Sequence, residues 1–174
     1  RPLLDSGPKA ISRRTAEVRL DRTDFDILAI LRKNARTPNK TIAERVGVAP
    51  STALERVRRL HEGGVLRGYH AELAPEALGI GLQALVAVRL RSHSRTDFDT
   101  FQAHLDALPE VTTYYHLGGA EDFLVHVGVR NAEHLREFAL TALTERPEVA
   151  HIQTHLIFRF QRKTDLPVYV EPEE

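Results

Sequence analysis

The sequence predicts an α+β protein, with an N-terminal winged helix-turn-helix followed by a C-terminal ferredoxin-like βαββαβ domain. Apolar residues recur at helical spacing between residues 23 and 62, with glycines between the runs. After residue 81 they alternate with polar residues, which is the period of a half-buried strand. Charge is also divided: residues 1–70 hold 15 Lys and Arg against 8 Asp and Glu, whereas residues 71–174 hold 9 against 16. The basic part is therefore the one expected to meet a polyanion.

The chain begins with a basic arm, residues 1–19, which has no sustained apolar period. The first helix is predicted over residues 23–34, with Thr23 as its N-cap. Asp24 and Asp26 would lie in the first turn, where the helix dipole favours acidic side chains. The buried stripe of this helix is expected to consist of Ile27, Leu28 and Leu31.

Two more helices and a ribbon complete the N-terminal half. The spacing predicts helices over residues 39–46 and 50–62, separated by a turn at Gly47. Proline suits the first helical position, and two glycines after residue 62 end the third helix. Residues 65–73 are predicted to form a two-stranded ribbon, tightened at Gly68, that would serve as the wing. The inward face of the third helix is formed by Ala53, Val57 and Leu60.

A linker, residues 74–81, precedes the second domain. The predicted strands and helices follow the order βαββαβ, over residues 82–90, 96–108, 111–117, 123–129, 132–145 and 149–160. Two βαβ units of similar length are what a ferredoxin-like sandwich requires. The expected domain bounds are 20–73 and 82–164, which leaves an acidic tail at 165–174.

Composition excludes several classes of protein. No apolar run is long enough for a membrane span and no secretory pattern opens the chain, so we expect no membrane partner and a cytoplasmic location. Cysteine is absent, which excludes disulfides and thiolate metal sites. His151 and His155 are four residues apart, but on a strand this spacing spans about 13 Å, too far for one ion. We expect no metal site, no cofactor and no catalytic residues, because no nucleophile–base or phosphate-binding motif stands out.

The exposed face of the third predicted helix carries the candidate nucleic-acid contacts. The major groove of DNA admits an α-helix, and hydroxyl and guanidinium groups can reach the base edges there. The residues expected to face the groove are Ser51, Thr52, Glu55, Arg56 and Arg59. The residues expected at the phosphate backbone are Arg58 and Arg67, with Asn39, Lys40 and Thr41 at the start of the second helix. The alternative is a solvated basic helix in a small helical bundle.

Residues 20–73 resemble the N-terminal half of the Lrp/AsnC (leucine-responsive/asparagine-operon) regulator family. The features that carry this resemblance are Leu20, Asp21, Asp24, Ile27, Leu28, Leu31, Arg36, Ala43, Val46, Gly47, Val48, Arg56, Val57, Arg59, Leu60, Gly64, Val65, Gly68 and Tyr69. Downstream, HLGGAEDFLVHV is similar to a strand–loop–strand of the family's effector domain, with Gly118 and Asp122 at matching positions. One departure is Ala49, which stands where the family usually has serine and removes an N-cap oxygen worth about 1 kcal/mol.

The resemblance implies a transcriptional regulator that binds double-stranded DNA. It also implies a C-terminal domain that binds a small effector, commonly an amino acid, and forms homodimers that assemble into tetramers or octamers. The candidate effector residues are Tyr114, His116, Gly118, Gly119, Ala120, Glu121 and Asp122. Glycines let backbone N–H groups converge on a carboxylate, and Glu121 or Asp122 would pair with an α-ammonium group. A simple hairpin turn is the alternative, since glycine and acidic residues favour one.

Two other functions remain open. The first is an effector-independent DNA organiser that uses its second domain only for oligomerisation. The second is an enzyme, because tetrapyrrole side-chain decarboxylases resemble this family in fold. Such an enzyme binds a large polyanionic macrocycle, and the excess of acidic residues after residue 70 argues against that substrate. We therefore expect a regulator rather than an enzyme.

Overall fold

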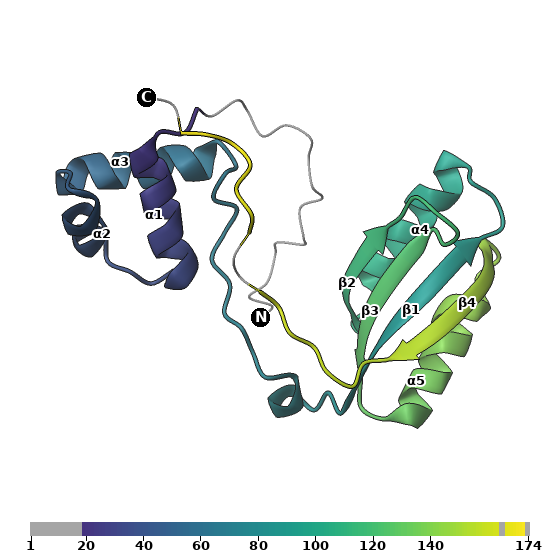
Figure 1. Ribbon diagram of the computed structural model, residues 1–174. Helices are drawn as coiled ribbons and strands as arrows, with labels where there is room; N and C mark the ends of the chain where they lie inside the picture. The colour runs from purple at the N-terminus through teal and green to yellow at the C-terminus, as the bar shows by residue number, and fades with distance from the viewer. Residues whose placement is uncertain (1–18, 164–165, 173–174) are drawn as a thin grey trace. The chain divides into compact units, whose positions relative to one another are not determined.

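The computed structural model describes residues 19–163 and 166–172, which fall into two compact units (Figure 1). One unit comprises the described part of residues 1–71 together with that of 161–174, and the other comprises residues 72–160. The predicted basic arm lies outside the described residues, apart from Arg19. The described part of the predicted acidic tail belongs to the first unit.

The first unit contains three helices: α1 (Arg22–Lys33), α2 (Asn39–Val46) and α3 (Pro50–Glu62). Gly47 ends α2 with a φ of 72°, a left-handed conformation that glycine adopts without strain. Aliphatic side chains from all three helices form one core, whose buried members are Ile27, Leu31, Ile42, Ala43, Ala53 and Leu60. The helical periodicity of the sequence is thus confirmed, and burial of this shared face holds the helices together.

The N-cap of α1 is Asp21, so the prediction of Thr23 as the cap is wrong. The backbone N–H of Asp24 donates to Oδ1 of Asp21 at 2.9 Å. In return, the N–H of Asp21 donates to Oδ2 of Asp24 at 3.2 Å. These two reciprocal bonds form a capping box and satisfy two N–H groups of the helix start. Thr23 is the second residue of α1, two positions after the N-cap, so its side chain does not serve as the cap.

At the start of α3, Ala49 is the N-cap residue and supplies no side-chain hydrogen bond, as its sequence position predicted. Ser51 does not replace it, since no side chain caps this helix. A different contact secures the helix start: Nδ2 of Asn39, the first residue of α2, donates to the carbonyl oxygen of Pro50 at 2.7 Å. The turn between the two helices is therefore held by α2 rather than by a cap.

The ribbon predicted over residues 65–73 is not formed, because this segment contains no paired strand. The N–H of Leu66 donates to the carbonyl of Leu60 at 2.9 Å, which closes the end of α3. Beyond it the chain runs without a ladder of hydrogen bonds. An isolated two-stranded hairpin is marginally stable in water, so alternation over a few residues is a weak basis for predicting one.

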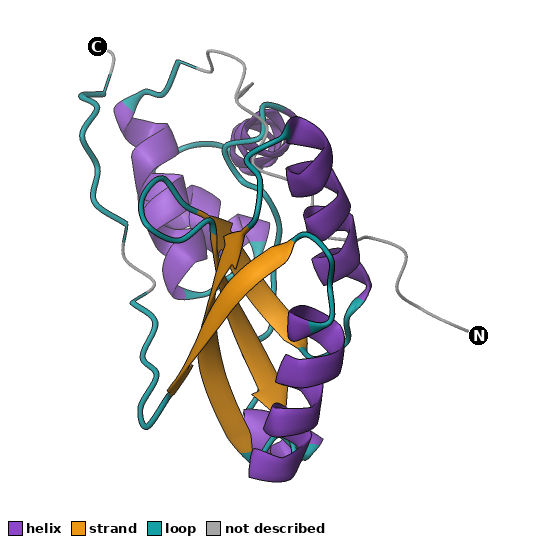
Figure 2. Ribbon diagram, turned by 90° about the vertical axis from the view of Figure 1, so that its right-hand side faces the viewer, coloured by secondary structure: helices purple, strands orange, loops and turns teal. Residues whose placement is uncertain are grey.

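The second unit has the predicted order βαββαβ. Its elements are β1 (Leu82–Leu90), α4 (Arg95–Ala107), β2 (Val111–His116), β3 (Phe123–Val129), α5 (Ala132–Phe138), which continues as a π-helical segment (Ala139–Thr144), and β4 (Val149–Leu156). The strands form one antiparallel sheet in the order β2-β3-β1-β4, and Figure 2 shows its twist. A short 3₁₀ helix (Pro75–Leu78) lies in the predicted linker.

Both long helices of this unit cover one face of the sheet (Figure 1). Alternate residues of β1 and β3 pack beneath them, including Val86, Val88 and Val125, together with Phe101 of α4 and Phe138 of α5. The opposite face carries the intervening residues of the strands. Because the loop between β2 and β3 leaves the sheet at one end of this core, packing of the strands fixes the position of that loop.

Candidate functional sites

Helix α3 presents one polar line away from its buried face. Ser51, Glu55, Arg58 and Glu62 are all exposed and recur at helical spacing. Within this line, Nη2 of Arg58 lies 3.2 Å from Oε1 of Glu55, and its Nε lies 3.6 Å from Oε1 of Glu62. All three side chains are about two-thirds exposed, so these ion pairs are weak.

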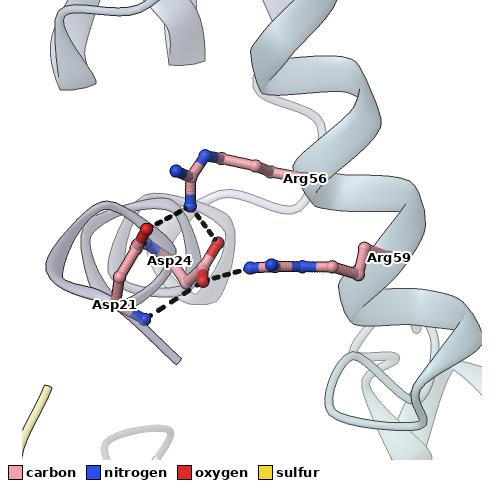
Figure 3. A network of polar contacts seen from close by, with 4 residues as sticks. All are labelled: Asp21, Asp24, Arg56 and Arg59. Carbon is pink, nitrogen blue, oxygen red and sulfur yellow. Dashed lines mark hydrogen bonds and ion pairs between the residues drawn. The ribbon is translucent and has the colours of Figure 1, made fainter. Parts of the chain in front are cut away.

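Two other arginines of α3 are bound to α1 (Figure 3). Nη1 of Arg56 lies 2.7 Å from Oδ2 of Asp21 and 2.9 Å from Oδ1 of Asp24. Nη2 of Arg59 pairs with Oδ2 of Asp24. The carboxylate of Asp24 has no exposed surface, and two guanidinium groups supply its counter-charge. The capping box of α1 therefore also fastens α1 to α3.

This network shifts the pKa values of its members. Burial raises the pKa of Asp21, but the hydrogen bond from the N–H of Asp24 and the contact with Arg56 outweigh it, so that the pKa lies below its ordinary value. Hydrogen bonds to Asp21 and then Asp24 raise the pKa of Arg56. Both shifts favour the charged forms, as expected for groups that bind each other.

The remaining predicted DNA contacts lie at the surface of the same unit. Thr52, Lys40 and Arg67 are exposed, whereas Thr41 is partly buried. Asn39 is engaged with Pro50, as described above. The predicted residues of α3 thus lie on one helix, but its arginines differ in their partners. Arg56 and Arg59 contact carboxylates at the start of α1, whereas Arg58 contacts glutamates of α3 itself.

The second candidate site is the loop from Leu117 to Asp122, between β2 and β3. Asp122 anchors it: Oδ2 accepts the N–H of Leu90 at 2.7 Å, and Oδ1 lies 3.1 Å from Nε2 of His93. The backbone N–H of Asp122 donates to the carbonyl of Val88 at 2.9 Å. Asp122 is buried and both of its carboxylate oxygens have protein partners. Its first role is therefore to hold the loop against β1.

Glu121 differs from Asp122. Its Oε2 is a buried side-chain oxygen for which the described residues provide no hydrogen-bond partner. A buried polar atom without a partner costs about 1–3 kcal/mol. Before it come Gly118, Gly119 and Ala120, which are exposed; Gly119 has a φ of 158°, which disfavours any larger residue there. The loop thus combines exposed backbone amides with one carboxylate oxygen that has no partner among the described residues.

Aromatic side chains adjoin this loop. The ring of His116 stacks on Phe123 with centroids 5.1 Å apart and lies 4.5 Å from the ring of Phe98. Tyr114 is oriented differently, because its hydroxyl donates to Oδ1 of Asp106 at 2.7 Å. His93 and Phe98 were not among the predicted site residues. They flank the start of α4, and only the tertiary fold brings them to a loop that begins 24 residues after His93 and 19 residues after Phe98.

Two classes of site have no support in the described part of the chain. It contains no group of three His, Asp or Glu side chains that would hold a metal ion. His151 and His155 both lie on β4, as predicted. None of the helices in residues 19–163 and 166–172 has the length and apolar character that a membrane crossing needs.

Comparison with known proteins identifies both units. Residues 20–67 match the winged helix-turn-helix DNA-binding family, and residues 83–165 match the Lrp/AsnC ligand binding domain. The HTH-type transcriptional regulator AldR of Mycolicibacterium smegmatis is 46% identical over 82% of this chain and 84% of its own. AldR of Mycobacterium tuberculosis is 40% identical over 88% of this chain and 86% of its own.

A solved structure gives the same result. The transcriptional regulator NMB0573 of Neisseria meningitidis, determined as an L-Met complex, superposes with a TM-score of 0.78 at 32% identity. The match covers 85% of this chain and 96% of that chain. The three helices of the first unit and the βαββαβ order of the second therefore occur together in a protein of the same type, and this chain belongs to the Lrp/AsnC family of transcriptional regulators.

Proposed function

We propose that this regulator binds a free α-amino acid at the loop from Leu117 to Asp122 and reads double-stranded DNA with α3. The observation that carries the ligand proposal is the buried, unpartnered Oε2 of Glu121. An α-ammonium group would give this oxygen a charged donor and remove the penalty of leaving it unsatisfied. The α-carboxylate of the same ligand would meet the exposed backbone amides of Gly118 to Ala120.

The relatives support this ligand class. Residues 83–165 match a ligand-binding domain, and NMB0573 was solved as a complex with L-Met. The rings of His116 and Phe98 lie close to the loop and would face an apolar or sulfur-containing side chain. Asp122, whose oxygens are already engaged, would position the loop rather than bind the ammonium group.

A panel of the free amino acids tests the ligand proposal. A ligand that binds only the folded chain raises Tm as its concentration rises, and the size of the shift reports its affinity. We expect at least one amino acid to raise Tm, and Glu121→Gln to abolish that shift. Glu137→Gln, at an exposed position of α5, is the matched control and should respond like the unchanged protein. A flat response to all amino acids would instead favour a DNA organiser that does not sense an effector.

Self-association is the second part of the proposal. The sheet face opposite α4 and α5 carries Leu85, Ala87, Leu124 and Tyr115 on neighbouring strands. We infer that this face packs against a second copy of the chain, because Tyr115 is exposed and Leu85 and Leu124 are partly exposed there, and apolar side chains gathered at a surface mark interfaces. Leu85→Arg should lower the mass measured by light scattering, whereas Arg95→Ala, at an exposed position on α4, should leave it unchanged.

Ligand and DNA are coupled only if the ligand binds two states of the assembly with different affinity. We infer that the bound amino acid changes the packing between dimers and so the spacing of their DNA-reading helices. A saturating ligand should therefore change either oligomer mass or DNA affinity. If a ligand that raises Tm changes neither, this coupling is absent even though binding is real.

DNA binding is tested by measuring affinity for the DNA upstream of this protein's own gene and for a random duplex, each over a series of salt concentrations. Phosphate contacts make affinity fall with salt for both duplexes, whereas base contacts appear as a ratio between them. We expect a ratio well above one. Regulation rather than catalysis is the activity that both units support, and we infer no enzymatic role.

A further inference from the structure

We propose that Arg58 is the arginine of α3 that contacts DNA bases. Arg56 and Arg59 instead stay paired with Asp24 and fix the orientation of that helix. This inference rests on the proposed DNA-reading function of α3. It reverses the assignment suggested by the sequence, which placed Arg56 and Arg59 at the bases and Arg58 at the phosphates.

The first argument is the cost of freeing each arginine. Arg56 is bound to two carboxylates, of which Asp24 has no exposed surface, and its own side chain is 25% exposed. If Arg56 turned toward a base, it would remove counter-charge from a buried carboxylate, which is strongly unfavourable. Arg59 is 48% exposed and contacts Asp24 through Nη2. Its remaining donors are suited to a phosphate beside the groove.

Arg58 has no such tie. Its partners are Glu55 and Glu62, both on α3 itself and both about two-thirds exposed. Exchanging pairs of this kind for another acceptor changes the free energy little. Arg58 also lies at the centre of the exposed line of α3, opposite the buried Ala53 and Leu60. Arg58 can therefore leave its present partners at little cost, and it points away from the core. Both properties suit it to donate two hydrogen bonds to O6 and N7 of guanine.

Two neighbours complete a reading set with Arg58. Glu55 lies one turn earlier on the same line, and its carboxylate is suited to accept from the N4 amino group of cytosine. Leu54 is 59% exposed on the flank of this line, although it is apolar and lies on a helix with a well-formed core. An exposed leucine at this position is suited to contact the C5 methyl group of thymine. The set predicts a half-site that contains a guanine and a thymine read in the major groove.

Modified bases give a direct test. The full-length protein first selects a site from a random duplex library. Each guanine of that site is then replaced by 7-deazaguanine, which lacks the N7 acceptor, and each thymine by deoxyuridine, which lacks the methyl group. For the unchanged protein, one 7-deazaguanine position should weaken binding roughly 5- to 150-fold. The affinity of Arg58→Ala should not change when that guanine is replaced by 7-deazaguanine. The affinity of Leu54→Ala should likewise not change at one position where thymine is replaced by deoxyuridine.

Arg56→Gln and Arg59→Gln are the contrasting variants. Both retain a donor for Asp24 but lose the charge, so they should reduce hydrogen-exchange protection of α1 and α3. They should remain sensitive to the same 7-deazaguanine as the unchanged protein. Arg58→Ala should leave the protection pattern unchanged, which shows that its effect on DNA is not a folding defect.

The outcomes are distinguishable. If Arg58→Ala keeps its sensitivity to 7-deazaguanine, or if Arg59→Gln loses it while both helices stay protected, the assignment of Arg58 is overturned. If the unchanged protein selects no sequence and binds all duplexes alike, the failure is that of the proposed reading of DNA by α3.

Discussion

Nη1 of Arg56, on α3, lies 2.9 Å from Oδ1 of Asp24, a carboxylate on α1 with no exposed surface. The same nitrogen lies 2.7 Å from Oδ2 of Asp21, so a single guanidinium nitrogen joins the capping box of α1 to α3. The orientation of the candidate DNA-reading helix therefore depends on a charge contact as well as on the shared aliphatic core.

Loss of this contact should destabilise the first unit. We expect Arg56→Ala to lower its free energy of unfolding by about 2 kcal/mol, because hydrogen bonds to charged groups contribute about 1.5–3 kcal/mol and a buried carboxylate loses a donor. Arg58→Ala, two positions away but fully on the surface line, should change it by less than about 0.5 kcal/mol. Denaturant unfolding followed by helical circular dichroism measures both. Equal effects of the two substitutions would contradict the role given to Asp24.

The pKa of Asp21 predicts how this stability depends on pH. Its pKa lies below the ordinary value of 3.8 in the folded chain, because the N–H of Asp24 and Arg56 outweigh the opposing effect of burial. The ionised carboxylate therefore stabilises the fold fully above the ordinary pKa, and this contribution is lost as pH falls through the lowered value. The unchanged protein should be more stable than Asp21→Asn at neutral pH. This difference should shrink as the solution is acidified below pH 3.8; a difference that is constant with pH would rule out the ion pair as its source.

Local chemistry made much of the fold predictable. Gly47 separates α2 from α3, Pro50 begins α3, and apolar residues at every second position mark the inward face of β1, so the observed bounds of these elements agree with the predicted ones. The contacts of Asp24 were not predictable in this way, because its arginine partners lie 32 and 35 residues further along the chain. Helical spacing indicates which side chains face outward but not which neighbouring helix they meet. The unpartnered oxygen of Glu121 likewise depends on how the loop packs.

The phenol of Tyr114 should titrate late. Burial, followed by the hydrogen bond that its hydroxyl donates to Asp106, raises its pKa to about 12. For a raised pKa, the stabilising contribution of the neutral phenol is complete below the ordinary value of 10.0 and is lost as pH rises through the folded value. Phenolate absorbance after a rapid pH jump should show one tyrosine ionising near pH 12. Tyr114→Phe should remove that step, and its persistence would assign it to another tyrosine.

The start of α3 offers a substitution that should stabilise the chain. Ala49 is the N-cap residue with φ −64° and ψ 147°, an extended conformation suited to a capping side chain, yet it supplies no hydrogen bond. Ala49→Ser should raise the free energy of unfolding of the first unit by about 0.5–2 kcal/mol, because its hydroxyl would accept an N–H of the first turn. Ala49→Val is the control, since it adds volume but no acceptor at this exposed position. If serine and valine have the same effect on denaturant unfolding, solvent already satisfies the N–H groups of the helix start, and the missing cap has no energetic consequence.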